Sequence, residues 1–390
     1  MSDKKRYDLI LEMVVELLDI PPSYYQKAAD RYRSLGEWLQ RKESKVSSFS
    51  PEIYPQGSFR YGTVIRPLLP TEEYDLDLVC QVDLQKIGIT QQHVKNLIGD
   101  EIKAYGEAHS FKEAVKEKPR CWRLNYADDV TFHMDILPCI PEDADAINLL
   151  VKIGVPIEFA RTAVAITDKR RPNYGIITRN WPTSNPRGIA AWFENRARPV
   201  AYIQIEELAK SRIYASVDKV PSYEWKTPLQ RSIQILKRHR DVMFKNSPEW
   251  KPLSMIITTL ATHAYGGETD FGIALENIVE GITKHVRSAR PRVPNPVNPG
   301  EDFADRWAKD ARFEQNFWTW HAQIKVDLNN LRILDKVPEI SRAVQKRFDL
   351  NLTGAMVSRL EATGVSAPRI IAAASTVHIA SGPKPWRRDD

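Results

Sequence analysis

Cysteine is scarce in this sequence, and long apolar runs are absent. The 390 residues include three cysteines, Cys80, Cys121 and Cys139, without the C-x-x-C spacing of a zinc site or redox pair. Scattered cysteines in odd number predict free thiols in a reducing compartment rather than disulfides. No window approaches the roughly 18 apolar residues of a membrane span, and acidic residues at positions 8, 12 and 16 interrupt any N-terminal export signal. We therefore expect a cytoplasmic protein that needs no membrane.

Neither sign of charge dominates the composition. There are 56 Lys and Arg residues against 50 Asp and Glu residues, which gives a net charge of +6. This surplus is compatible with a polyanionic ligand such as a nucleotide or nucleic acid but does not require one. Hydrophobic residues make up 42% and charged residues 27%, which is typical of a globular protein with a sizeable core. At about 150 residues per domain, the length allows two or three domains.

Helical periodicity dominates both ends of the chain, whereas a period of two begins at residue 51. Thr227 and Gln230 form a T-x-x-Q capping box with Pro228 between them, which predicts a long helix from residue 228. The proline-rich segment 290–300 is expected to be a loop. The predicted helices are 4–18, 23–44, 95–108, one beginning at 186, one at 228, one near 253 and others up to about 362; the predicted strands are 53–54, 73–80 and a hairpin of 120–126 and 130–137.

Two aspartates stand on one face of a predicted strand. In "EYDLDLVC", residues 73–80, Asp75 and Asp77 are two positions apart, so their side chains point the same way about 6.6 Å apart. The alternate residues are apolar and would face the core. Two like charges at this separation raise each other's pKa, and a divalent cation would compensate them. An isolated D-x-D is more often only the polar face of an edge strand, so its interpretation depends on the rest of the chain.

Two further features make the pattern specific. Gly57 and Ser58, in "PQGSFRYGT", form a small turn whose backbone N–H groups and hydroxyl can approach phosphate oxygens, because glycine has no Cβ. Asp135 lies on the polar face of the neighbouring hairpin. Carboxylates from two strands can hold two Mg²⁺ ions about 3.5 to 4 Å apart, which clamp the attacking hydroxyl and leaving pyrophosphate of an in-line displacement. We expect Asp75, Asp77 and Asp135 to be catalytic metal ligands, with Mn²⁺ able to replace Mg²⁺.

This order of motifs resembles the DNA polymerase β-type nucleotidyltransferase superfamily. More narrowly, the chain is similar to the bacterial cGAS/DncV-like nucleotidyltransferases, also called CD-NTases, with a SMODS core domain. The broad likeness rests on "PQGSFRYGT", "EYDLDLV" and "VTFHMDILP". The narrower likeness adds "WPTSNPRGIAAWFENR", "PLQRSIQILKRHRDVMF", "KPLSMIITTLATHAY" and "VPNPVNPGEDFADRW", so it extends over most of residues 51 to 310.

The resemblance implies an α+β fold with two lobes and an active-site cleft between them. One lobe is a mixed β-sheet that carries the aspartates, and the other is helical. On this basis we expect N-terminal helices in residues 1–50 that pack across both lobes. The catalytic core would then span 51–215, the helical lobe 216–380, and a flexible tail 381–390.

The resemblance also implies the activity. Family members join nucleoside triphosphates into cyclic di- or trinucleotides, which signal phage infection to a separate effector protein in anti-phage (CBASS) operons. The implied substrates are ATP alone or ATP with GTP or another NTP; no nucleic acid is required, and a regulatory partner protein occurs in some relatives. Carried over to this chain, the resemblance implies that Gly57 and Ser58 hold the donor triphosphate, and that Lys237 and Ser254 contact its phosphates.

Two more residues are candidate nucleotide contacts on physical grounds. Arg60 follows the Gly-Ser turn and could offer charge to a triphosphate, although an exposed ion pair with Glu72 or Glu73 is an equal alternative. Tyr223 could stack on a base, but aromatic residues near the start of a helix more often belong to the core. Histidine ligation of a metal is not predicted, because the sequence contains neither H-x-x-x-H nor H-E-x-x-H.

Two other functions are compatible with the same fold. A template-independent RNA 3′-end nucleotidyltransferase would need an elongated basic groove with stacking aromatics, and the sequence shows no dedicated RNA-binding segment. A catalytically silent nucleotide or RNA sensor would not need the three aspartates and the Gly-Ser turn, all of which are present. The sequence therefore favours the synthase over both alternatives.

Overall fold

The computed structural model describes residues 3–69, 72–111, 113–126, 132–209 and 226–362. The α-helices are α1 (Asp3–Leu18), α2 (Pro22–Gln40), α3 (Gly57–Tyr61), α4 (Gln91–Ala108), α5 (Ala144–Lys152), α6 (Ile157–Ala160), α7 (Pro186–Ala209), α8 (Pro228–Met243), α9 (Ser254–Ala264), α10 (Phe271–Gly281), α11 (Ala311–Ile333), α12 (Val337–Phe348) and α13 (Gly354–Ala362). The strands are β1 (Glu52–Pro55), β2 (Tyr74–Gln81), β3 (Lys116–Glu117), β4 (Trp122–Tyr126), β5 (Phe132–Pro141), β6 (Val164–Ile166), β7 (Thr183–Ser184), β8 (Pro294–Asn295) and β9 (Asn298–Asp302).

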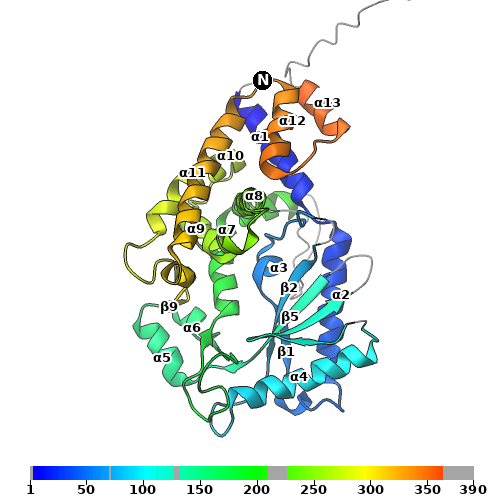
Figure 1. Cartoon of the computed structure of the whole chain (residues 1–390), viewed down its shortest axis with the longest axis vertical. Helices are drawn as coiled ribbons and strands as arrows, with labels where there is room; N and C mark the ends of the chain where they lie inside the picture. The colour runs from blue at the N-terminus through cyan, green and yellow to red at the C-terminus, as the bar shows by residue number, and fades with distance from the viewer. Residues whose placement is uncertain (1–2, 70–71, 112, 127–131, 210–225, 363–390) are drawn as a thin grey trace, which may run out of the picture.

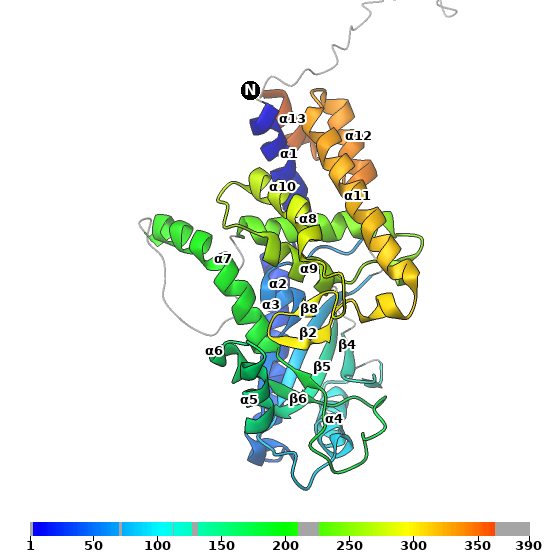
Figure 2. The ribbon, with the colours of Figure 1, turned by 90° about the vertical axis from the view of Figure 1, so that its left-hand side faces the viewer.

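The molecule is long, with helices at one end and the main sheet at the other (Figures 1 and 2). Helices α1 and α10 to α13 lie at one end, the sheet with α4 and α5 lies at the other, and α8 and α9 lie between them. The sheet has the order β1-β2-β5-β4-β3, and β6 pairs with both β5 and β7. β2 and β5 are parallel, whereas the other pairs are antiparallel. The predicted α+β fold with a mixed sheet is therefore confirmed.

Alternation along β2 separates a core face from a polar face. Leu76, Leu78 and Cys80 are at most 4% exposed, and they pack in a hydrophobic cluster with residues of α2 and α4. α4 approaches the sheet closely at Gly99, where a Cβ atom would lie 2.3 Å from the indole ring of Trp122. The two helices therefore cover one face of the sheet, and the row of aspartates occupies the other.

A second hydrophobic cluster forms the helical end of the molecule. The predicted capping box is present at the start of α8: Thr227 Oγ1 accepts the backbone N–H of Gln230, whose side chain accepts the backbone N–H of Thr227. Along this helix the apolar side chains of Leu229, Ile233 and Leu236 are fully buried. α1 packs against α8, α10, α11 and α13, whereas α2 packs against β1 and α4. These contacts support the division into two lobes, whose boundaries stay a prediction.

Several predicted elements differ from the structure. α2 ends at Gln40 rather than 44, because the backbone becomes extended at Arg41. The predicted loop at 290–300 contains the paired strands β8 and β9, and strands β6 and β7 are absent from the sequence-based prediction. The predicted hairpin turn and the predicted tail 381–390 fall outside the described residues. Among the helices of the described ranges, none is long and apolar enough to cross a membrane.

Candidate active site

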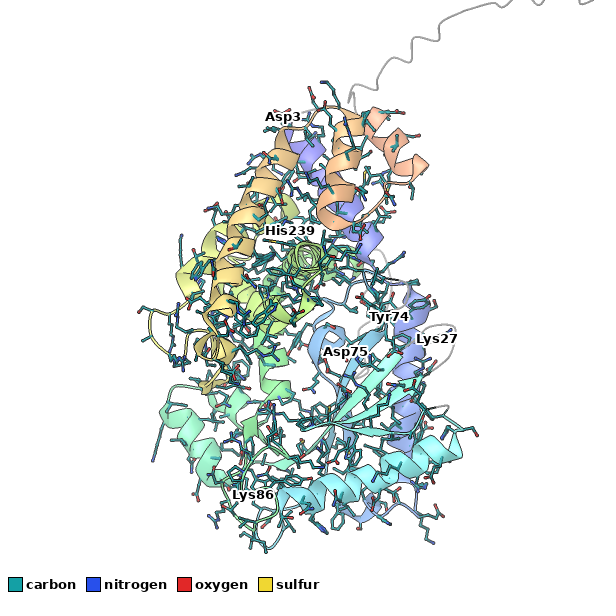
Figure 3. All side chains as sticks on the ribbon, viewed as in Figure 1. Asp3, Lys27, Tyr74, Asp75, Lys86 and His239 are labelled. Carbon is teal, nitrogen blue, oxygen red and sulfur yellow. The ribbon has the colours of Figure 1, made fainter. Side chains whose placement is uncertain are left out.

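Three carboxylates meet on the polar face of β2 and β5. The parallel register sets Asp77 beside Asp135, and Asp75 beside His133. One ligand atom each from Asp75, His133 and Asp135 all lie within 4.8 Å of one another, which is close enough to hold one metal ion. Figure 3 shows Asp75 next to α3, on the side of the sheet that faces α8. The structure therefore brings together the three aspartates that the sequence singled out.

The turn at Gly57 lies directly against these carboxylates. Gly57 is the first residue of α3 and has φ +65°. A Cβ atom at this position would lie 2.4 Å from Oδ2 of Asp77, which is too close for any side chain. The preceding residue, Gln56, donates its backbone N–H to the carbonyl oxygen of Asp77 at 2.8 Å. Glycine is therefore needed here both for its backbone conformation and for the close approach.

The neighbouring carboxylates and burial shift the pKa of Asp77. Burial, followed by repulsion from Asp75 and then from Asp135, raises the pKa of Asp77 to about 8. A nearby cation would offset the repulsion and favour the ionised form. Clustered carboxylate oxygens are the ligands that Mg²⁺ and Mn²⁺ prefer. The chemistry of this donor set therefore fits a divalent metal ion.

Arg123 holds Asp135 from the neighbouring strand. Nε and Nη2 of Arg123 donate to the two carboxylate oxygens of Asp135, each at 2.6 Å. The two residues are register partners on β4 and β5, and the contact with Asp135 raises the pKa of the guanidinium group. Arg123 also lines the cleft. The sequence-based prediction missed this residue, although strand alternation places it on the face of the aspartates.

His133 contacts Asp75. Its Nε2 lies 2.8 Å from Oδ1 of Asp75, and its Nδ1 lies 3.1 Å from Oε2 of Glu73. Burial disfavours the protonated ring, but the hydrogen bond to Asp75 and the negative charges of Asp75 and Asp135 together outweigh burial, so the pKa of His133 is raised. The imidazole therefore lies between two carboxylates at the edge of the acidic cluster.

The opposite wall of the cleft consists of α8 and the start of α9. The cleft has a volume of about 770 Å³, and Lys237 and Ser254 line it together with the Gly-Ser turn. Lys237 is 5% exposed and donates from Nζ to Oγ1 of Thr63 at 3.0 Å. Burial, followed by repulsion from Arg240, lowers the pKa of Lys237 to about 7. Ser254 Oγ accepts a hydrogen bond from Nη1 of Arg240 at 2.8 Å.

A polar stripe on α8 joins this wall to the Gly-Ser turn. Gln230 donates from Nε2 to the carbonyl oxygen of Tyr61, and Gln234 donates from Nε2 to that of Val64, each at 2.8 Å. With Lys237, these residues occupy positions i, i+4 and i+7 on one helix face. The stripe binds the backbone at the end of α3 and just after it, so hydrogen bonds connect the two walls directly.

The β8–β9 hairpin forms a third side of the cleft. Asn295 and Glu301 line the cleft, and Asn295 donates from Nδ2 to Oε2 of Glu301 at 2.8 Å. Burial raises the pKa of Glu301. Asn298 donates from Nδ2 to the carbonyl oxygen of Thr183 at 3.2 Å, which connects the hairpin to β7. Asn295 lies in the predicted loop 290–300 and Glu301 directly after it; both fall within the motif "VPNPVNPGEDFADRW", but the sequence-based prediction assigned neither of them a role.

Two predicted nucleotide contacts lack structural support. Arg60 is not among the cleft-lining residues of the described chain. It forms an ion pair with Glu194 at 2.6 Å. The alternative role in an ion pair is therefore present, but the partner is Glu194 and not Glu72 or Glu73. Residues two apart on a helix do not share a face, which explains why Arg60 leaves the side of α3 on which the serine lies. Tyr223 falls outside the described residues.

Comparisons with known proteins agree with this site. Residues 51–138 match the family model described as cyclic GMP-AMP synthase DncV-like, nucleotidyltransferase domain. A protein named c-di-GMP synthase from Roseivirga ehrenbergii is 28% identical over 318 residues, which cover 80% of this chain and 76% of the relative. The cyclic dinucleotide synthase CdnG from Bradyrhizobium diazoefficiens is 24% identical over 335 residues, which cover 80% and 73%.

Solved structures share the fold over nearly the whole chain. The structure of Bradyrhizobium diazoefficiens CdnG in complex with GTP has a TM-score of 0.64 at 20% identity and covers 92% of this chain and 99% of that one. A mutant of the Vibrio cholerae dinucleotide cyclase DncV, in complex with ATP and GTP, has a TM-score of 0.55 at 12% identity and covers 91% and 88%. The family model over residues 51–138 and the related sequences, together with this shared fold, support a bacterial cGAS/DncV-like nucleotidyltransferase.

Proposed function

We propose that this enzyme joins nucleoside triphosphates into a cyclic dinucleotide and that GTP is one of its substrates. The observation that carries the proposal is the meeting of Asp75, Asp77 and Asp135 beside the turn at Gly57, because the reaction needs acidic metal ligands next to a phosphate-binding turn. The relatives named c-di-GMP synthase and cyclic dinucleotide synthase favour a two-nucleotide ring and a guanine nucleotide. ATP, expected from the sequence, is the alternative second substrate.

The proposed metal ligands are Asp75 and Asp77, with Asp135 completing the site. Two Mg²⁺ ions, replaceable by Mn²⁺, would stabilise the charge that develops on the attacking and leaving oxygens. Both carboxylate oxygens of Asp135 accept hydrogen bonds from Arg123. Each of these oxygens keeps a second lone pair, so Asp135 could ligate a metal while Arg123 holds it.

The proposed chemistry occurs twice in one cleft. A ribose hydroxyl oxygen attacks the α-phosphorus of a bound triphosphate, the bond from that phosphorus to the α,β-bridging oxygen breaks, and pyrophosphate leaves. The hydroxyl proton passes to a carboxylate oxygen of Asp135. The Gly57–Ser58 turn binds the donor phosphates on one side, and Lys237 and Ser254 contact them from the other. The linear intermediate then turns over in the cleft, so that its free hydroxyl attacks in the second step.

Glu301 supports guanine as a base. An ionised carboxylate only accepts hydrogen bonds. The Watson–Crick edge of guanine offers two neighbouring N–H donors, at N1 and N2, whereas the matching positions of adenine, N1 and C2, carry no N–H donor. Oε2 of Glu301 already accepts from Asn295, which leaves Oε1 for a base in the cleft. The carboxylate thus favours GTP over ATP.

The role of the product is proposed from the family. We expect the cyclic dinucleotide to signal phage infection to a separate effector protein, with synthesis under the control of a regulatory partner. Both reactants are triphosphates, so the chemistry requires neither a nucleic-acid template nor a membrane.

Incubation of the purified full chain with each NTP, singly and in pairs, with Mg²⁺ or Mn²⁺ tests this proposal. Mass spectrometry should detect a phosphatase-resistant cyclic dinucleotide whenever GTP is present. Asp75→Asn with Asp77→Asn should lower turnover by at least roughly a hundredfold, and equal turnover would refute the assignment of chemistry to these carboxylates. Product that forms only after an RNA 3′ end is added would identify an RNA nucleotidyltransferase, and triphosphate binding without consumption would identify a sensor.

A further inference from the structure

We propose that His133 is a positioning residue that fixes the carboxylate of Asp75 for metal binding, with Glu73 fixing the ring from its other side. The inference rests on the proposed function, because it assumes that Asp75 is a metal ligand. It names two residues, His133 and Glu73, that neither the sequence motifs nor the metal site require.

The geometry of the three side chains carries this proposal. His133 and Asp75 are register partners on the parallel strands β5 and β2, so the ring and the carboxylate start from neighbouring backbone positions. Nε2 of His133 lies 2.8 Å from Oδ1 of Asp75, and Nδ1 lies 3.1 Å from Oε2 of Glu73. Glu73 precedes Asp75 by two residues and therefore stands on the same face. Both ring nitrogens are thus occupied, which fixes the ring in one orientation.

The exposure of the side chains shows why Asp75 needs such a partner. The side chain of Asp75 is 54% exposed, whereas that of His133 is 16% exposed. A half-exposed carboxylate on a strand can adopt several rotamers, and ordering it costs conformational entropy. The less exposed, doubly contacted ring removes that freedom before any metal arrives. It binds Oδ1 and leaves Oδ2 of Asp75 for the ion.

Direct ligation of the metal by His133 is the rival interpretation, since its ligand atom lies within 4.8 Å of those of Asp75 and Asp135. The contacts favour the positioning role. Nε2, the nitrogen closest to Asp75, already points at Oδ1, so an ion bound to Nε2 would have to displace that oxygen. Partners that orient a metal ligand in this way typically change metal affinity by 10- to 100-fold when they are removed.

Two substitutions of His133 distinguish its contact with Asp75 from its contact with Glu73. A glutamine amide can reach the place of Nε2 and donate to Asp75, whereas an asparagine amide reaches only the place of Nδ1, on the side of Glu73. We therefore expect His133→Asn to weaken binding of Mn²⁺ to the nucleotide-free full chain by about 10- to 100-fold, and His133→Gln to retain most of the affinity. Isothermal titration with MnCl₂ measures both affinities. His93→Asn, at an exposed position on α4, is the matched control and should bind Mn²⁺ like the unchanged chain.

Spectroscopy of the Mn²⁺-loaded chain distinguishes positioning from ligation. Electron spin-echo spectra of the unchanged chain should show no nitrogen coupling from a directly bound imidazole. A nitrogen coupling that disappears in His133→Asn would overturn the proposal in favour of direct ligation. Mn²⁺ affinity in His133→Asn equal to that of the unchanged chain would also overturn it.

Asp75→Asn separates this inference from the proposed function. If Asp75→Asn abolishes Mn²⁺ binding while His133→Asn leaves it unchanged, the positioning role is wrong and the metal site stands. If Asp75→Asn has no effect on Mn²⁺ binding, the metal site itself is wrong, and the role of His133 is refuted with it. Thermal unfolding of each variant shows whether the comparison is made on folded protein, and His133→Gln keeps the test available if His133→Asn does not fold.

Discussion

Replacing Gly57 by alanine tests how closely the turn approaches the carboxylates. The backbone has φ +65° there, and a Cβ atom would lie 2.4 Å from Oδ2 and 3.2 Å from Cγ of Asp77. A left-handed backbone costs alanine roughly 1–2 kcal/mol, and the contact additionally forces Asp77 or α3 to move. A misplacement of about 1 Å can lower a rate by about 100-fold. We therefore expect Gly57→Ala to lose at least about 1–2 kcal/mol of unfolding free energy and about 100-fold in turnover.

Gly88→Ala separates backbone strain from the steric contact. Gly88 has φ +80°, and nothing lies within 4 Å of its Cβ position; it is also not among the cleft-lining residues of the described chain. Alanine there should lower the free energy of unfolding by a similar roughly 1–2 kcal/mol and leave turnover unchanged. Chemical denaturation measures stability, and pyrophosphate release measures turnover. If Gly57→Ala turned over as fast as Gly88→Ala, the inferred approach of the turn to Asp77 would be wrong.

Three further substitutions give separate tests. In the folded chain the pKa of Lys237 is about 7, whereas in the unfolded chain it is about 10.4. Burial of the charged lysine therefore lowers the free energy of unfolding at low pH. Lys237→Met removes this charge and should stabilise the nucleotide-free fold. The gain should be largest below pH 7 and shrink toward pH 10.4; urea denaturation across this range measures it, and a gain that grows with pH would contradict the reasoning. Glu301→Gln should reduce the preference for GTP over ATP by about tenfold in competition assays, and an unchanged preference would place the base elsewhere. Arg60→Met should leave the KM for nucleotide nearly unchanged, because its guanidinium pairs with Glu194; a large increase would restore Arg60 as a nucleotide contact.

The positions of the aspartates could be predicted because they depend on local rules. Strand alternation alone places Asp75 and Asp77 on one face and Leu76 on the other, and the structure has this arrangement. The capping box at Thr227 likewise depends on only four residues. The position of Asp135 beside Asp77 was harder to predict. It requires β2 and β5 to be neighbours in the sheet, and no local sequence pattern specifies that pairing.

The missed residues depend on register and on long-range packing. A hairpin with its turn centred on residue 128 would pair Arg123 with His133, whereas the structure pairs Arg123 with Asp135, two residues farther along. Arg60 lies close to the turn in sequence but pairs with Glu194, because residues two apart on a helix do not share a face. The β8–β9 pair was missed because prolines usually indicate a loop, but Pro294 and Pro299 are tolerated in this two-stranded pair because proline needs no ladder N–H at an edge.

The contacts of Lys237 link the fold of α8 to its proposed chemistry. Lysine has three N–H donors, and Thr63 accepts two hydrogen bonds from Nζ, one at its carbonyl oxygen at 3.2 Å and one at Oγ1 at 3.0 Å. These contacts join residues 174 positions apart in the sequence and leave one donor for a phosphate oxygen. Burial lowers the pKa of the free lysine to about 7, but an arriving triphosphate favours the charged form. On the proposed function, a donor nucleotide between α8 and the Gly-Ser turn would therefore shift Lys237 toward its charged form.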